Sequence, residues 1–268
     1  MMQDAVNRIG ANRRTFLKTA GLTGVGLVGA TMIAGRMGAL DQKVQAAAYS
    51  DADILNFALN LEYLEAEFYA MATYGARLVN LGVISKDDES GPTTGGAKVP
   101  NFSSSPWAYV ATALRNSEIE HVVYLRKALG SAAVKKPAIN LDALGYGFSS
   151  VSNWLKLARQ FEDVGVSAYL GAAPLITSSA YLAAAGAILS TEAFHSGSIR
   201  LGCIMNNVTS PAVDAHDIPP TSKNLYDVDS NALAIPRTPS EVLNIVYAGG
   251  SSSGGFYPNG MNGTITMQ

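Results

Sequence analysis

The sequence predicts an all-α fold: an up-down-up-down bundle of four helices followed by a long irregular C-terminal tail. Apolar residues recur at helical spacing through four long segments, and glycine, proline and serine are concentrated between them. Two Glu-x-x-His motifs fall inside two of these segments, at a spacing that places both side chains on one helix face. We therefore expect the bundle to span residues 49–206 and the tail to span residues 207–268.

Residues 1–48 are interpreted as an export signal of the twin-arginine type. Arg13 and Arg14 precede an uncharged stretch rich in glycine and alanine, and the small residues at 46–48 suit a signal peptidase. A membrane anchor is the alternative, which the shortness and glycine content of the stretch disfavour. We expect a mature chain that begins near Tyr49, is exported to the periplasm, cell envelope or extracellular space, and keeps no membrane span.

The first three helices are delimited by capping residues. The first is expected to start from about Ser50, with Asp51 or Asp53 as its cap, and to end near Asn80. The second is expected from Ser105-Pro106 to about Leu129, because proline is tolerated in a first turn and glycine follows the last residue. The third is expected over about 151–173, where a proline ends it.

The fourth helix is expected from Ser178 or Ser179 to about Asn206. Residues 164–191 contain no charged side chain, a length that could also span a bilayer. Pro174 and a Thr-Ser-Ser cluster divide this stretch, so burial of two helices in a protein core is the better interpretation.

The composition excludes some classes of function. A net charge of −2 and a pI near 5.9, with no basic stripe, give no reason to expect a nucleic-acid partner. Cys203 stands alone, so no intramolecular disulfide can form, and its apolar neighbours predict a small buried residue. In the tail, Asp214, His216 and Asp217 could hold a metal, but without a spacing pattern a loop surface is favoured.

The Glu-x-x-His motifs point to metal binding. Glu118 with His121, and Glu192 with His195, could each grip one ion from one helix face, and they use two of the chain's three histidines. An ordinary surface hydrogen bond is the alternative for a single motif, but the duplication disfavours it. Di-iron bundles combine two such motifs with one glutamate from each of two further helices.

Two isolated glutamates complete this pattern. Glu62 and Glu162 each have a tyrosine about two turns downstream on the same face, Tyr69 and Tyr169. The chain then consists of two similar helical hairpins. Glu65 is the alternative to Glu62, but it has no counterpart in the second hairpin, so symmetry favours Glu62.

Six residues are thus the expected ligands of two metal ions, with iron expected and manganese as the alternative. We expect Glu118 and Glu192 to bridge the ions, the other glutamates to bind terminally, and each imidazole to serve one ion. The expected ligands are Glu62, Glu118, His121, Glu162, Glu192 and His195.

With these motifs in place, residues 50–268 resemble the ferritin-like superfamily. Residues 53–69 and 254–260 are similar to its ferritin-like-domain branch, which includes desiccation-related proteins. The resemblance implies the four-helix metal site. The long tail and the lack of a fifth bundle helix differ from cage-forming ferritins and argue against iron storage.

Two functions follow as hypotheses. The first is an exported di-metal protein that reacts with dioxygen or peroxide, as an oxidase, ferroxidase or peroxidase, with Tyr69 and Tyr169 as hydrogen-bond donors or electron sources beside the ligands. The second is a structural or stress-protective envelope protein whose metal does not turn over. A homo-oligomer is compatible with either, because apolar residues of the tail can pack on the bundle or on a neighbouring subunit.

Overall fold

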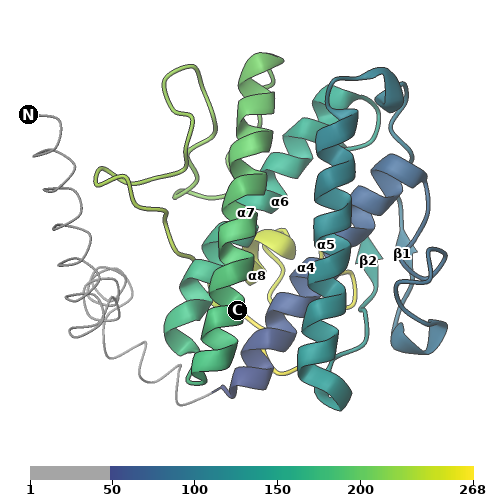
Figure 1. Cartoon of the computed structure of the whole chain (residues 1–268), viewed down its shortest axis with the longest axis vertical. Coiled ribbons are helices and arrows are strands. Elements are labelled where there is room, and N and C mark those ends of the chain that lie inside the picture. The colour runs from purple at the N-terminus through teal and green to yellow at the C-terminus, as the bar shows by residue number, and fades with distance from the viewer. Residues whose placement is uncertain (1–48) are drawn as a thin grey trace, which may run out of the picture. The chain divides into compact units, whose positions relative to one another are not determined.

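Five α-helices organise the part of the chain that the computed structural model describes, residues 49–268. Helices α4 and α5 pack against each other along their length, and so do α6 and α7 (Figure 1). The all-α bundle expected from the sequence is confirmed. The helices are α4 (Asp51–Tyr74), α5 (Ala108–Leu129), α6 (Val151–Ala172), α7 (Ser179–Met205) and the short α8 (Pro239–Val246).

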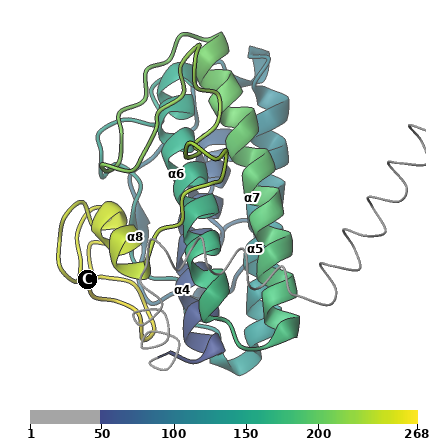
Figure 2. The same cartoon turned by 90° about the vertical axis from the view of Figure 1, so that its left-hand side faces the viewer.

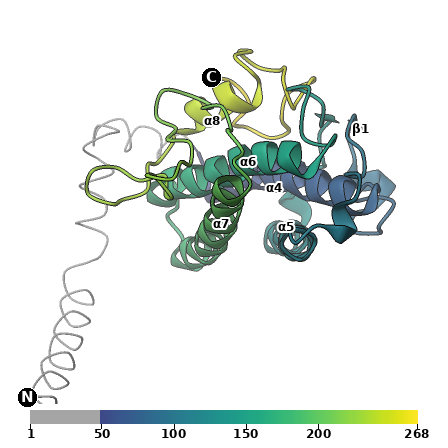
Figure 3. The same ribbon diagram turned by 90° about the horizontal axis from the view of Figure 1, so that it is seen from above.

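The bundle has a central layer made of α4 and α6. Figure 3 shows α5 and α7 on one side of this layer, and α8 with the C-terminal chain on the other. The carboxylate of Asp51, at the start of α4, accepts hydrogen bonds from the backbone N–H groups of Thr177 and Ser178, both at 2.8 Å, in the link between α6 and α7. The start of α4 therefore lies beside the end of α6, so the two helices run in opposite directions.

The helix ends lie close to the expected positions, with three corrections. The cap of α4 is Ser50, whose hydroxyl accepts the N–H of Asp53, and not Asp51 or Asp53. However, α4 ends at Tyr74 and not near Asn80, because Gly75 adopts φ 70° and returns its N–H to the helix. Helix α5 begins later than Pro106, since residues 102–104 form a separate 3₁₀ turn.

The link between α6 and α7 matches the sequence pattern. Helix α6 gives way to a 3₁₀ turn, Ala173–Leu175, that contains Pro174, and the Ser178 hydroxyl caps α7. No helix within residues 49–268 is both long enough and apolar enough to cross a membrane. The expected export signal, with Arg13 and Arg14, lies outside these described residues.

The C-terminal chain covers the outer face of the central layer (Figure 2). The Tyr257 hydroxyl donates to the backbone oxygen of Asn60 at 2.7 Å, and the Asn60 side chain bonds both ways with the backbone of Asn262. These contacts pair polar groups in the middle of α4 that would otherwise be buried unsatisfied. Consequently α4 is buried on all sides over most of its length.

Two long connections are joined by a short pairing that the sequence did not indicate. Strand β1 (Thr93–Thr94) pairs in parallel with β2 (Ile139–Asn140). It links the α4–α5 connection to the α5–α6 connection, and the buried Lys136 ammonium donates to Thr93 and to backbone oxygens beside it.

Candidate metal centre

All six residues expected as ligands meet in the middle of the bundle. The carboxylates of Glu62, Glu118, Glu162 and Glu192 are fully buried, one from each long helix. The two histidines, His121 and His195, are almost as buried and present their Nδ1 atoms to these carboxylates. Helical periodicity brings this about, because each pair lies one turn apart on the face that points into the bundle.

One group forms around His121. Its Nδ1 lies 3.2 Å from Glu62 Oε2, 3.1 Å from Glu118 Oε2 and 3.2 Å from Glu192 Oε1. The ligand atoms of these four residues all lie within 4.8 Å of one another, so they could hold a metal ion.

A second group forms around His195 and shares two glutamates with the first. The His195 Nδ1 lies 2.7 Å from Glu118 Oε1, 3.4 Å from Glu162 Oε2 and 3.8 Å from Glu192 Oε1. The ligand atoms of Glu118, Glu162, Glu192 and His195 also all lie within 4.8 Å of one another. Glu118 and Glu192 belong to both groups, and the two oxygens of Glu118 face different histidines.

Two tyrosines cross between the hairpins to hold the remaining glutamates. The Tyr69 hydroxyl, on α4, donates to Oε1 of Glu162 on α6, and the Tyr169 hydroxyl, on α6, donates to Oε1 of Glu62 on α4 at 2.5 Å. Each tyrosine thus fixes one carboxylate oxygen, while the other oxygen of that carboxylate faces a histidine. This reciprocal pattern gives the cluster approximate twofold symmetry.

Burial and mutual repulsion shift the pKa values of the cluster. Burial raises the pKa of Glu118 to about 7, against the lowering effect of its hydrogen bond with His121 and of the nearby His195 imidazole. Burial and the charge of Glu118 raise the pKa of Glu192 well above its ordinary range. Burial alone would lower the pKa of His195, but the nearby charges of Glu162 and Glu118 raise it to about 11. In the protein alone, protons therefore balance the carboxylate charge, a role that divalent cations can take over.

The donor set fits metal ions better than it fits a hydrogen-bond network. Buried oxygens of Glu118, Glu162 and Glu192 and the Nδ1 of His195 have no hydrogen-bond partner of acceptable geometry, although they lie close together. Within residues 49–268, no lysine or arginine forms an ion pair with these carboxylates. Lone pairs that converge on one another without donors between them are stabilised by cations.

A glycine makes room beside the cluster. A Cβ at Gly165 would lie 2.6 Å from Glu192 Oε2 and 3.3 Å from Glu65 Oε1, too close for any larger residue without a shift. Glu65 itself is buried but belongs to neither ligand group. Glu65 and Gly165 both line a cavity described below, a placement that a single-sequence pattern could not reveal.

Other acidic side chains are neutralised by arginines. Asp163, Asp217 and Asp227 also come close together, but Arg200 lies 2.5 Å from Asp163 and Arg159 lies 2.6 Å from Asp217. In the tail, Asp214 accepts two hydrogen bonds from Arg237, and Asp217 faces Arg159, so Asp214, His216 and Asp217 do not form one ligand group.

The lone cysteine is a structural residue. Cys203 is fully buried on α7, as expected from its apolar neighbours, and burial raises the pKa of its thiol to about 11. A thiol that stays protonated is a poor nucleophile and a poor ligand, so it plays no part in the cluster.

Comparison with known proteins places these observations in a family. The sequence pattern of the ferritin-like domain family matches residues 50–203, which include α4 to α7 and all six clustered residues. A curated protein named ferritin-like catalase Nec2, from Nesocodon mauritianus, is 24% identical over 272 residues, covering 82% of this chain and 86% of that protein.

Proposed function

This chain belongs to the ferritin-like domain family, and from that premise we propose that its buried cluster binds two metal ions and decomposes hydrogen peroxide. The observation that carries the proposal is the pair of four-residue groups that share Glu118 and Glu192. The related protein named a catalase supports peroxide over dioxygen as the oxidant. The chain's own geometry supports the number of ions and the role of each ligand.

In this proposal the shared glutamates are the bridges. Glu118 directs one oxygen toward each histidine, at 3.1 Å and 2.7 Å, which suits a carboxylate that spans two ions. Glu62 with His121 completes one ligand set, and Glu162 with His195 completes the other. The tyrosine hydroxyls keep the terminal carboxylates oriented, and such supporting hydrogen bonds raise metal affinity.

The ligand chemistry narrows the choice of metal. A set of carboxylates with one imidazole for each ion, and no thiolate, suits iron or manganese. Either metal, when bound, supplies the electron transfer that breaks the O–O bond of peroxide. The protein contributes a buried, apolar surround that excludes bulk water from the cluster.

The test replaces one bridging ligand. Glu192→Ala should lower the bound metal and reduce peroxide decomposition by about 100-fold or more, because both ligand sets lose a member. Glu120→Ala is the control, since Glu120 is an exposed glutamate on α5 that has no part in the cluster. Metal content and oxygen release are measured on proteins loaded with iron or with manganese. Full peroxide decomposition by Glu192→Ala would contradict the proposal.

A structural role for the metal is the second candidate. The four fully buried carboxylates favour it, because their charges destabilise the fold unless cations or protons balance them. If the wild-type protein shows negligible turnover with either metal, and chelation lowers its melting temperature strongly, a stabilising or stress-protective function replaces the catalytic one. Peroxide turnover faster than that of the free metal ions, together with only a small fall in melting temperature on chelation, supports catalysis.

A further inference from the structure

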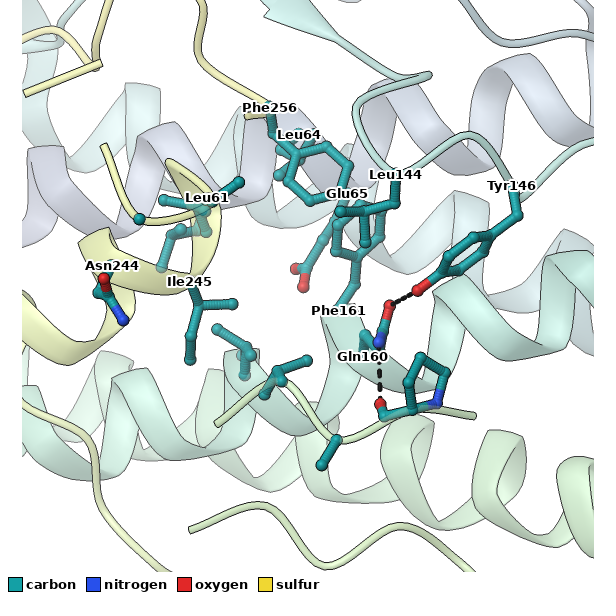
Figure 4. Close-up of a pocket in the computed structure, with 18 residues that line it drawn as sticks. Leu61, Leu64, Glu65, Leu144, Tyr146, Gln160, Phe161, Asn244, Ile245 and Phe256 are labelled. Atoms are coloured by element: carbon teal, nitrogen blue, oxygen red, sulfur yellow. Dashed lines mark hydrogen bonds between the residues drawn. The ribbon is translucent and has the colours of Figure 1, made fainter. Parts of the chain in front are cut away.

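A cavity of about 360 Å³ lies between the central α4–α6 layer and the C-terminal chain (Figure 4). Most of its wall is apolar. The side chains that define it come from α4, α6, α8 and the chain after α8, namely Leu61, Leu64, Phe161, Val164, Ile245 and Phe256. The tail therefore builds one wall of a chamber whose other wall is the bundle.

The polar groups of this cavity are few and are placed at defined points. The Glu65 carboxylate projects into it from α4, as Figure 4 shows. Tyr146 and Gln160 line another part, where the tyrosine hydroxyl donates to Gln160 Oε1 at 2.8 Å and Gln160 donates to Pro211 O at 3.0 Å. None of the described lining residues is a lysine or an arginine.

The cavity adjoins the metal cluster through Gly165. This glycine lines the cavity, and a Cβ on it would lie 2.6 Å from Glu192 Oε2 and 3.3 Å from Glu65 Oε1. Gly165 therefore lies between the cavity and Glu192, a proposed bridging ligand. A molecule in the cavity would sit beside the cluster without replacing any of the six ligands.

The size and polarity of the cavity indicate its occupant. A water molecule takes up about 30 Å³ of liquid, and peroxide is little larger, so decomposition of peroxide needs no chamber of this volume. Ligand sites for small organic molecules are apolar concavities of about 300–1,000 Å³ with a few oriented polar groups. An anion would lose its hydration in this apolar cavity and find no lysine or arginine among the described lining residues to compensate.

We propose that this cavity binds a neutral, mainly apolar organic molecule whose hydroxyl group points toward Glu65. The apolar body would pack on residues such as Phe161 and Ile245, and the hydroxyl would form a hydrogen bond with the carboxyl group of Glu65. Binding of this kind depends on the shape of the cavity and on Glu65, and it does not require metal.

A role for the molecule as a reductant rests on the proposed function. With a phenol ArOH the balance is H₂O₂ + 2 ArOH → 2 H₂O + 2 ArO•. The O–O bond breaks, each phenol gives up one electron and one proton, and two O–H bonds form in the water produced. Peroxide is the oxidant, and the position of the cavity beside Glu192 suits transfer of electrons to the cluster.

Binding is tested with 2-naphthol, which is neutral at pH 7, and with 2-naphthoate, its anionic match. Fluorescence anisotropy with metal-free protein should show binding of 2-naphthol and much weaker binding of 2-naphthoate. Ile245→Trp, which fills the cavity, should weaken 2-naphthol binding by about tenfold or more. Leu182→Trp, on the exposed face of α7, is the control.

Leu144→Trp is a second filling variant, from the exposed rim of the cavity, in case Ile245→Trp does not fold. Unchanged 2-naphthol affinity in a folded filling variant, or equal binding of naphthol and naphthoate, would overturn the proposal.

The reductant role is tested separately in metal-loaded protein. Added 2-naphthol should lower the oxygen released per peroxide consumed and should itself be oxidised. If the protein binds 2-naphthol but shows no peroxide turnover, the proposed function is refuted and the proposed binding cavity is not.

Discussion

At the scale of single residues, the crossed tyrosines show how the cluster is held. Tyr69 donates to Glu162 and Tyr169 donates to Glu62. Burial, followed by the nearby glutamate charge, raises the pKa of each tyrosine well above its ordinary range, so both hydroxyls keep their protons and act as donors. Their first task is therefore to orient the carboxylates.

Tyr69→Phe should lower metal affinity by about 10- to 100-fold, because Glu162 loses the donor that fixes its orientation. Competition with a chelator for Mn²⁺ measures this. Tyr109→Phe is the matched control, since Tyr109 is 82% exposed. Equal affinities in the two variants would show that the Tyr69 hydroxyl does not support the site.

Asp227 provides a test of pH dependence outside the metal cluster. Burial, with repulsion from Asp163 and Asp217, raises its pKa from 3.8 to about 6. The folded protein therefore binds a proton there that the unfolded chain has released, so the free energy of unfolding falls as pH rises through this window and stays lower above it.

Asp227→Asn should remove this fall in the free energy of unfolding with rising pH. The variant should match the wild type near pH 4 and be more stable at pH 7, by about 1 kcal/mol once solvent screening of this half-buried group is allowed for. Urea unfolding at both pH values measures the difference. Asp87→Asn, at an exposed position, controls for the loss of one negative charge. A stability gain of the same size at pH 4 would contradict this explanation.

Much of the cluster was predictable from spacing alone. Glu118 with His121, and Glu192 with His195, share helix faces because a helix repeats every 3.6 residues, and the structure brings them together with Glu62 and Glu162. The place of Glu65 was not predictable, because it depends on Gly165 opposite it and on the cavity wall that the tail supplies.

At the scale of elements, the helices were predictable where local chemistry decides them. Ser178 caps α7, one of the two residues expected there, whereas α4 is capped by Ser50 and not by the expected Asp51 or Asp53. The end of α4 was predicted too late, because the apolar pattern continues past Gly75 although that residue turns the chain. The β1–β2 pairing could not be foreseen, since its strands are two residues long and meet only in the folded protein.

The contact between α6 and the tail gives a prediction at this scale. A Cβ at Gly171 would lie 1.9 Å from the carbonyl oxygen of Arg237, so Gly171→Ala should separate the tail from α6 and destabilise the protein by about 1–3 kcal/mol or more. Gly197→Ala is the control, because Gly197 on α7 has open space around it and alanine should stabilise the helix by about 0.5–1 kcal/mol. Opposite signs in urea unfolding are expected. Similar effects from both would show that the tail does not pack closely on α6.

At the scale of the whole molecule, the tail is where the sequence was least informative. Its packing combines buried apolar residues such as Phe256 with single polar contacts such as Tyr257 to Asn60, and neither kind of contact follows a periodic pattern. A wall of the proposed binding cavity therefore comes from a segment whose residues, taken in order, indicate only loops and one short helix.

Export is a prediction about the whole chain that rests on sequence alone. If residues 1–48 are a twin-arginine signal, replacing both Arg13 and Arg14 with lysine should block export and leave the protein in the cytoplasm. Immunoblots of cell fractions measure this. The control is Lys127→Arg, on the exposed surface of α5. The adjacent pair Lys135 and Lys136 is unsuitable as a control because Lys136 is buried. Normal export of the double-lysine variant would reject the twin-arginine interpretation.

The crossed hydrogen bonds also constrain the order of events in folding. They join residues that are 93 and 107 positions apart in the chain, and each one links the first hairpin to the second. Contacts this distant in sequence form late, because a long loop must close before they can be made. Neither four-residue ligand group is complete until both hairpins have docked, because each group takes one glutamate from the other hairpin. The rate at which refolding chains capture metal in the complete site should therefore report the docking step.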